Sequence, residues 1–446
     1  MLRKILGMLC GILWGCVLYC GTAYAEEAEW ENTKIEAEGR LNVLSLSDNN
    51  TNTYVKMKES NVVIVSRTDG IGALYIKFDR IPQEWQVTNP ENGETYTCGE
   101  NDFLHEYIDV SRVFGEMPQK LELAFEEGTV VADIFAFSEG EVPAWVQKWE
   151  PPCEVADLLL ISSHSDDEQL FFLGLLPYYA GELGMNVQVA YVIQHFENGG
   201  IMDHQRPHEQ LDGLWTVGVK NYPVMSDFPD LYAQSKNRQE ALKQAESVFE
   251  AKGITHEDFV AYMTECIRRF KPVVVVSHDL DGEYGHGTHV LAADALTEAI
   301  ELTGDSSQFT DSAKKYGVWE IDKLYLHLYE ENPIIMDYDK PLENFGGKTA
   351  YEVSCEGFMC HKSQHWTWFY KWIFGSEENP YKKASQIKTY SPCKFGLYYS
   401  NVGTDAEGGD FFENADTHEE DVMQFFDKLA VKIIDATDKT SKGVYE

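Results

Sequence analysis

The chain has 446 residues, of which 43% are hydrophobic and 13% aromatic, and a formal net charge of −38 at pH 7. This length exceeds what one ordinary hydrophobic core uses, so we expect two or three domains, and the composition excludes a largely disordered chain. The negative charge argues against nucleic acid and anionic lipid as partners, because such a chain repels phosphate groups. Neutral substrates or bound cations fit better, and solubility outside the cell accounts for most of the acidity.

The first 25 residues have the features of a secretory signal peptide. Two basic residues precede an apolar run from Ile5 to about Tyr19, and a small-x-small cleavage site follows at Ala23-Tyr24-Ala25. We therefore predict cleavage after residue 25 and a secreted or cell-surface protein. A membrane association is expected only through an uncleaved N-terminus, and a membrane anchor or a lipid on Cys16 or Cys20 stays open as an alternative.

The predicted cleavage changes the charge and the cysteine content. It removes two basic residues and no acidic one, which takes the net charge from −38 to −40. An oxidising compartment would permit disulfides, but the sequence does not specify their pairing and has no CxxC spacing typical of a sulfur-ligated metal. Six cysteines would remain: Cys98, Cys153, Cys266, Cys355, Cys360 and Cys393.

Residues 26–150 are predicted to form a small antiparallel β-sandwich domain. Short alternating segments rich in Val, Ile, Tyr and Phe are separated there by turn signals such as Asn-Asn and Asp-Gly. Glycan binding is one hypothesis for this domain. Three prolines near residue 150 mark the domain boundary. The predicted strands are NVLSLS, YVKMK, NVVIVSR, ALYIKFD, EWQVT, KLELAF and VVADIFAFS.

Residues 151–446 show a different pattern, in which apolar strands alternate with longer helical stretches. The succession predicts βαβ units, and hence an α/β fold with a Rossmann-like, mostly parallel sheet and helices on both faces. In such folds, ligands bind outside the carboxyl ends of the strands. The site is therefore expected at that edge of the sheet.

One cluster of polar residues follows the predicted strand LLLIS at residues 158–162. His164, Asp166, Asp167 and Glu168 stand where the next helix begins. Carboxylates there can cap the free N–H groups of the helix, which is an alternative reading for a single aspartate. Capping does not explain a histidine together with two adjacent aspartates.

A second cluster follows the predicted strand PVVVVS at residues 272–277. His286 and His289 lie three residues apart and hence on one face of a helical first turn. His278, directly after the strand, stays open between a supporting role at the site and a loop hydrogen bond. Because both clusters follow parallel strands, they supply a His/Asp set of the kind a catalytic zinc ion needs, with one position left for water.

These motifs resemble those of the PIG-L/LmbE-like family of zinc-dependent N-acetylglucosaminyl deacetylases. The family's A-H-P-D-D-E stretch appears as residues 163–168, SHSDDE, and its later G-x-Y-G-H-P-D-H as residues 282–289, GEYGHGTH. Its R-x-x-E helix is similar to residues 206–209, its Pro-Asp turn to residues 229–230, and its H-x-S-Q helix to the CHKSQ at 360–364.

The resemblance, which covers about residues 155 to 365, implies one zinc ion per chain held by His164, Asp167 and His289. Asp166 would be the general base that takes the proton of the attacking water. Adjacent aspartates at a helix start diverge by about 100°, so one ligand and one base is the natural division between them.

The same resemblance assigns the remaining site residues. His286 with Tyr284 would stabilise the oxyanion and protonate the leaving amine, and Arg206 and Asp230 would contact sugar hydroxyls. For Arg206, an ion pair with Glu209 one helical turn away is an equal alternative.

The sequence departs from the family pattern at two places. Ser165 replaces a proline, which changes the stiffness of the loop. Gly287-Thr288 replaces Pro-Asp and so removes a carboxylate that would orient and charge a histidine. Asp281 or Glu283 could compensate; without compensation, His286 would be a weaker acid while zinc binding persists.

The resulting hypothesis is a secreted zinc-dependent hydrolase that removes acetyl from an N-acetylated amino sugar or its conjugate. The alternatives are a carbohydrate-binding surface protein with a degraded deacetylase domain and a zinc amidohydrolase of a non-sugar amide. The expected partner is a small carbohydrate or glycoconjugate. We also expect residues 195–209 to form a substrate loop, and the tryptophans of HWTWFYKWIF to belong to the core rather than to a sugar platform.

Overall fold

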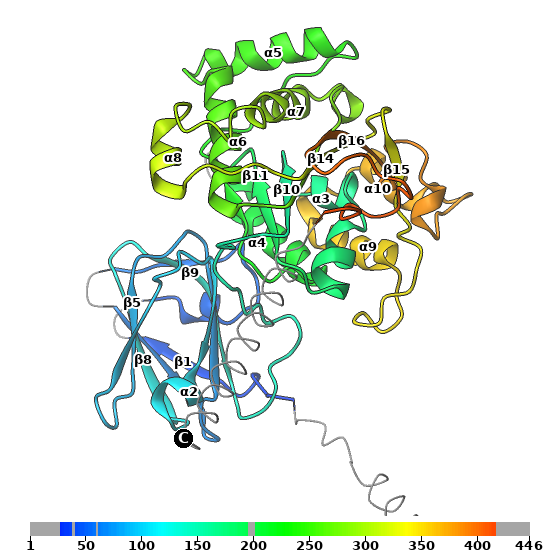
Figure 1. Ribbon diagram of the computed structural model, residues 1–446. Helices are drawn as coiled ribbons and strands as arrows, with labels where there is room; N and C mark the ends of the chain where they lie inside the picture. The colour runs from blue at the N-terminus through cyan, green and yellow to red at the C-terminus, as the bar shows by residue number, and fades with distance from the viewer. Residues whose placement is uncertain (1–26, 38–40, 59–60, 195–200, 416–446) are drawn as a thin grey trace, which may run out of the picture. The chain divides into compact units, whose positions relative to one another are not determined.

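The computed structural model describes residues 27–37, 41–58, 61–194 and 201–415. The predicted signal peptide and its alternatives, and the beginning of the predicted substrate loop, lie outside these residues. Within the described ranges, no helix has the length and apolarity required to cross a bilayer. The chain divides into two compact units, Met1–Val146 and Gln147–Glu446 (Figure 1). The six cysteines of the described chain are all unbonded.

The first unit contains two antiparallel sheets, with strand orders β1-β3-β8-β5-β6 and β2-β9-β4-β7. Phe78 of the second sheet packs edge-on against Trp85 and Phe125 of the first, so aromatic rings join the two. NVLSLS forms a 3-10 helix, in which only Leu46 is buried, rather than the expected strand. The elements are β1 Lys34–Ala37, η1 Val43–Leu46, β2 Val55–Lys56, β3 Val62–Ser66, β4 Ala73–Phe78, β5 Trp85–Thr88, β6 Thr95–Cys98, β7 His105–Asp109, α2 Val110–Phe114, β8 Lys120–Phe125 and β9 Val130–Phe137.

The second unit is built on a seven-stranded sheet of order β12-β11-β10-β13-β14-β16-β15. The first five strands of this order are parallel, and β16 and β15 are antiparallel to their neighbours. This arrangement confirms a mixed α/β fold. The strands are β10 Leu158–Ser162, β11 Val187–Tyr191, β12 Val224–Met225, β13 Val274–Ser277, β14 Lys323–His327, β15 Pro333–Ile335 and β16 Lys394–Ser400.

Helices surround this sheet and cover its apolar strands. Every residue of β10, β11 and β14 is buried, as strands covered on both faces require. The helical elements are α3 Asp167–Leu170, η2 Pro177–Glu182, α4 Ile201–Thr216, α5 Arg238–Glu250, α6 His256–Phe270, η3 Glu283–Gly285, α7 Gly287–Ala299, α8 Thr310–Tyr316, α9 Ala350–Cys360, η4 Lys362–Gln364, α10 Thr367–Phe374 and η5 Ala384–Gln386.

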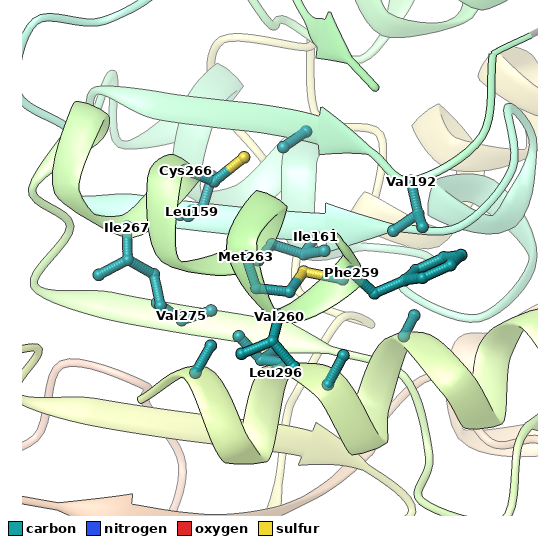
Figure 2. Packing of buried hydrophobic residues seen from close by; sticks show 14 of the residues in the cluster. Leu159, Ile161, Val192, Phe259, Val260, Met263, Cys266, Ile267, Val275 and Leu296 are labelled. Atoms are coloured by element: carbon teal, nitrogen blue, oxygen red, sulfur yellow. The ribbon is translucent and has the colours of Figure 1, made fainter. Parts of the chain in front are cut away.

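The packing of α6 shows how the sequence builds this core. Thr255 and Asp258 form a capping box at its start, which satisfies free N–H groups of the first turn. Phe259, Met263 and Ile267 recur every four residues and are fully buried. Figure 2 shows this apolar stripe against side chains of the sheet and of α7.

The stretch after the first polar cluster is not the single long helix that its apolar pattern predicts. It divides into α3 and the π-helical η2. Gly174 lies between them with φ 94°, and a Cβ there would come within 2.3 Å of the Tyr338 ring, so the chain turns where no other residue fits. Pro177 then begins the second helix. The break leaves α3 only one turn long at the edge of the sheet.

Candidate metal centre and its surroundings

The two polar clusters meet at the carboxyl ends of β10 and β13, which pair directly in parallel. The strand order reverses here, because β11 lies on one side of β10 and β13 on the other. Crevices at such switch points are where open α/β sheets bind ligands. The segments that follow the two strands therefore face one another across the site, as the sequence predicts.

Three of the predicted ligand atoms form a nearly equilateral triangle. Asp167 Oδ2 lies 3.2 Å from His164 Nδ1 and 3.3 Å from His289 Nε2, and the two histidine nitrogens lie 3.2 Å apart. Ligands held at 2.0–2.1 Å in a tetrahedral zinc site stand about 3.3 Å from one another. The side chains of His164, Asp167 and His289 therefore fit a zinc ion and leave one side of the triangle for a fourth ligand.

Carboxylates lie behind both histidines and hold their rings. Glu283 Oε2 lies 2.7 Å from His289 Nδ1, and Asp230 Oδ1 lies 3.5 Å from His164 Nε2. When these nitrogens donate to the carboxylates, the opposite ring nitrogens turn their lone pairs toward the triangle. This is the usual support of histidines that bind metals.

The electrostatics of the triangle fit a site that can hold a cation. Burial opposes the charged imidazoles, but hydrogen bonds with Asp167 and Asp230 outweigh it and raise the pKa of His164 to about 10. Attraction and hydrogen bonding to Asp167, with Glu283, likewise raise the pKa of His289 to about 9 against burial. Burial would raise the pKa of Asp167, but the charges of His289 and His164 hold it well below its usual value. Positive charge at the two histidines and negative charge at Asp167 thus stabilise one another.

A second group of possible ligands, Asp167, His278 and His289, also gathers here. The Ser163 N–H donates to His278 Nε2 at 2.8 Å, and His278 Nδ1 lies 2.8 Å from Glu283 Oε2. The Nε2 lone pair is already used, so His278 cannot offer it to a metal. Its pKa is lowered, chiefly by burial, which agrees with a neutral ring. His278 therefore makes a hydrogen bond with the loop and also contacts Glu283 beside the site. Both readings left open by the sequence describe part of its role.

Asp166 stands beside the triangle in an unusual backbone conformation. Its φ of 121° is costly for a residue with a Cβ, and such strain concentrates at functional sites. The side chain makes no capping hydrogen bond, so the capping alternative is wrong for this residue. Burial raises the pKa of Asp166 to about 7, against the lowering effect of Arg206, whose Nη2 lies 3.6 Å from Asp166 Oδ1.

His286 and Tyr284 lie next to the histidines of the triangle. The His286 ring centroid is 4.8 Å from that of His164 and 5.5 Å from that of Tyr284. His286 Nδ1 is buried and has no hydrogen-bond partner among the described residues. Burial, with the charges of His289 and His164, holds the pKa of His286 well below its usual value. Burial also raises the pKa of Tyr284 well above 10, so its hydroxyl stays protonated.

Arg206 and Asp230 lie next to residues of the site, Arg206 near Asp166 and Asp230 near His164. Arg206 Nη2 donates to the Ser165 carbonyl at 2.6 Å, and Nη1 lies 4.0 Å from Asp230 Oδ2. Glu209 accepts hydrogen bonds from Ser363 and Gln205 instead of pairing with Arg206, so the ion-pair alternative is wrong. Asp230 keeps 30% of its side chain exposed, which leaves it accessible from the crevice.

Glu283 joins three histidines beneath the site. Its carboxylate lies 2.7–2.8 Å from Nδ1 of His278, His289 and His327, and these contacts hold its pKa well below its usual value despite burial. Glu283, one of the two carboxylates that could have compensated for the missing one, is therefore not the partner of His286, because its oxygens face the other histidines. Asp281 is exposed.

His327, which no sequence motif indicated, is a further residue that supports Glu283. It ends β14, the strand next to β13, and is fully buried. A histidine as the last residue of the strand KLYLH, at the same edge of the sheet, was the available signal. The substrate loop expected over residues 195–209 is, in its described part, the beginning of α4.

Comparison with known proteins bears on this geometry. Residues 159–300 match the family PIG-L, described as GlcNAc-PI de-N-acetylase. A 1D-myo-inositol 2-acetamido-2-deoxy-alpha-D-glucopyranoside deacetylase of Rhodococcus jostii is 26% identical over 189 residues, which cover 40% of this chain and 63% of that protein. The protein of the same name from Kineococcus radiotolerans is 33% identical over 201 residues, which cover 40% of this chain and 53% of that protein. The chain thus spans less than two thirds of the length of these relatives.

Among solved structures, the N,N'-diacetylchitobiose deacetylase of Pyrococcus horikoshii is similar with a TM-score of 0.37 and 14% identity, covering 55% of this chain and 85% of that one. The family match spans both polar clusters, from β10 to the end of α7. The part of the chain that carries both polar clusters is therefore similar to the PIG-L family.

Proposed function

We propose that this protein is a zinc-dependent deacetylase that hydrolyses the N-acetyl group of an acetylated amino sugar of the N-acetylglucosamine type. The observation that carries the proposal is the triangle of His164, Asp167 and His289, with edges of 3.2–3.3 Å, beside a buried aspartate that is not one of its corners. The names of the relatives, which are deacetylases of a 2-acetamido sugar linked to inositol, support the substrate class.

The division of labour follows from the environments of the two aspartates. A zinc ion in such a site supplies Lewis-acid chemistry, because it acidifies water and polarises a carbonyl. Asp167 stays ionised among its histidines, as a ligand must. Asp166, with its pKa raised to about 7, can take a proton from the attacking water near neutral pH.

The opposite wall of the site stabilises the developing oxyanion. Tyr284 keeps its hydroxyl proton and can donate it in a hydrogen bond, and a neutral His286 can donate from one ring nitrogen. His286 is a strong acid when it carries a second proton, but its lowered pKa makes that state rare. Arg206 and Asp230 then present a donor and an acceptor to sugar hydroxyls.

The remaining expectations belong to the same proposal. We assign the second unit to a Rossmann-like fold, supported by its five parallel strands, and the first unit to a β-sandwich domain that binds glycan. The proposed protein acts outside the cell, on a neutral carbohydrate, with one zinc ion per chain and without a nucleic-acid partner. Retention of all three ligands and of Asp166 favours an enzyme over a degraded domain.

Acetate release from N-acetylglucosamine conjugates tests the proposal. Zinc-loaded protein should release acetate, and Asp166→Ala should not. Absence of zinc from the purified protein, or equal rates in the variant, would overturn the mechanism. Release from acylated peptides but not from amino sugars would favour the amidohydrolase of a non-sugar substrate.

A further inference from the structure

Two tryptophans at the start of α10 are exposed, against the expectation that this stretch belongs to the core. Trp366 and Trp368 keep 49% and 52% of their surface accessible. Their rings stack with centroids 5.5 Å apart and planes within 4° of parallel. Exposed aromatic surface of this size costs solubility, so a contiguous patch usually marks a binding site.

A continuous series of ring contacts links this pair to Tyr284 and His286, the residues proposed to stabilise the oxyanion. Centroids are 5.8 Å apart from Trp368 to Phe369, 5.3 Å from Phe369 to Trp372, and 5.3 Å from Trp372 to Tyr284. Tyr284 in turn lies against His286. The exposed pair is therefore the outer end of an aromatic wall whose inner end is part of the site.

Along this series of ring contacts, Trp366 and Trp368 are separated from Tyr284 by other aromatic residues. Trp368 and Trp372 are four residues apart on α10 and hence lie on one face, about one helical turn from each other. The contact between Trp372 and Tyr284 adds a further 5.3 Å between ring centroids. Phe369 and Trp372 thus stand between the exposed pair and Tyr284 in this series of contacts, a position that suits a sugar farther along a chain than the one that loses its acetyl group.

We propose that Trp366 and Trp368 form a subsite for a distal sugar, and that the substrate is a neutral oligosaccharide or polysaccharide of N-acetylated amino sugars. The inference rests on the proposed deacetylase function. The C–H face of a pyranose ring packs on the electron-rich face of an aromatic ring, and a flat, rigid pair of rings offers that face at low entropic cost. The net charge of −38 disfavours anionic chains.

The test uses N-acetylglucosamine oligomers of one to six units with the zinc-loaded full chain. For the wild type, kcat/KM should rise with length. In the double variant Trp366→Ala/Trp368→Ala, the ratio of kcat/KM for the hexamer to that for the monosaccharide should fall about tenfold, the loss of one good stacking contact. Trp366→Phe/Trp368→Phe should recover most of the ratio. Tyr398→Ala, which removes another exposed ring of the same unit, should leave the ratio unchanged.

Binding separates failure of the subsite from failure of the proposed function. Zinc-loaded Asp166→Asn should bind the hexamer, and adding the double Trp→Ala change should weaken that binding by a similar factor. A length dependence that persists without both tryptophans, or none in the wild type, overturns the subsite while the deacetylase stands. No acetate from any length overturns the deacetylase and with it this inference. Binding to anionic vesicles that needs both tryptophans, without a length effect, assigns the pair to a membrane and also overturns it.

Discussion

The two sides of the site differ in how their histidines are supported. On the metal side, His289 has Glu283 behind it at 2.7 Å, and Glu283 is itself held by two further histidines. On the acid side, His286 Nδ1 is buried and unpartnered among the described residues, and Thr288 donates toward the Leu231 carbonyl. Glu283 thus supports one of the proposed metal ligands, whereas no carboxylate of the described residues hydrogen-bonds to His286 Nδ1. Zinc binding and proton donation should therefore respond separately to mutation.

The largest effect on zinc content and activity is expected when one of the three proposed zinc ligands is removed. His289→Ala leaves Asp167 and His164 without the third ligand, so zinc content should fall below one ion per chain and acetate release to background. Metal analysis after gel filtration measures the first and an acetate assay the second. His256→Ala, the same change at a histidine of α6 outside the site, should alter neither. A variant that keeps full zinc would contradict the ligand set.

Asp166→Asn should be the next largest change and should leave zinc in place. Loss of a general base typically costs about 10²- to 10⁴-fold in rate. In the native protein the base must be ionised, so activity should rise with pH on the acidic side. A dication beside Asp166 would lower its pKa from about 7, so this limb should lie below pH 7. A pH–rate profile for both proteins checks this, and an unchanged acidic limb in the variant would exclude Asp166 as the base.

Glu283→Gln tests the support of His289, because it changes the carboxylate that contacts His289 Nδ1. The amide cannot accept from all three histidines, and its NH₂ group would oppose one of their N–H donors. Zinc affinity should fall by about 10- to 100-fold, the usual cost of removing such a partner. Competition with a chelator measures the Kd. Glu298→Gln on α7, whose carboxylate lies 3.2 Å from His256 Nε2, is the matched control. Equal affinities would show that Glu283 does not position His289.

The smallest effect is expected from returning a carboxylate to the acid side. Thr288→Asp should raise the pKa of His286 and increase kcat by up to about tenfold, with zinc affinity little changed. Thr288→Asn, equal in size but uncharged, should give no gain. If Thr288→Asp changed zinc affinity instead of kcat, the separation of the two sides would be wrong.

Much of the site could be predicted because its residues lie at strand ends. The apolar strands placed His164, Asp166 and Asp167 after one strand and His289 after another, at the same edge of the sheet. The structure brings these residues together. Periodicity could not predict that α3 would stop after one turn, since the break depends on the Tyr338 ring above Gly174.

Partners contributed by distant segments were equally hidden. Glu283 and Asp281 were both open as substitutes for the carboxylate missing at residue 288, but the Glu283 carboxylate turns toward His327 from another strand. The exposure of Trp366 and Trp368 was hidden too, since the short α10 buries Phe369 and Ile373 on a different face. These features depend on tertiary contacts that local sequence does not encode.

X-ray absorption at the zinc edge of the native protein tests the central claim most directly. We expect two imidazole nitrogens and one carboxylate oxygen from the protein, at about 2.0–2.2 Å, with a fourth light ligand from solvent. His286 can also approach His164 and His289 closely enough to share an ion with them. A spectrum with three imidazoles, and unchanged by Asp167→Asn, would contradict the triangle and make His286 a ligand rather than an acid.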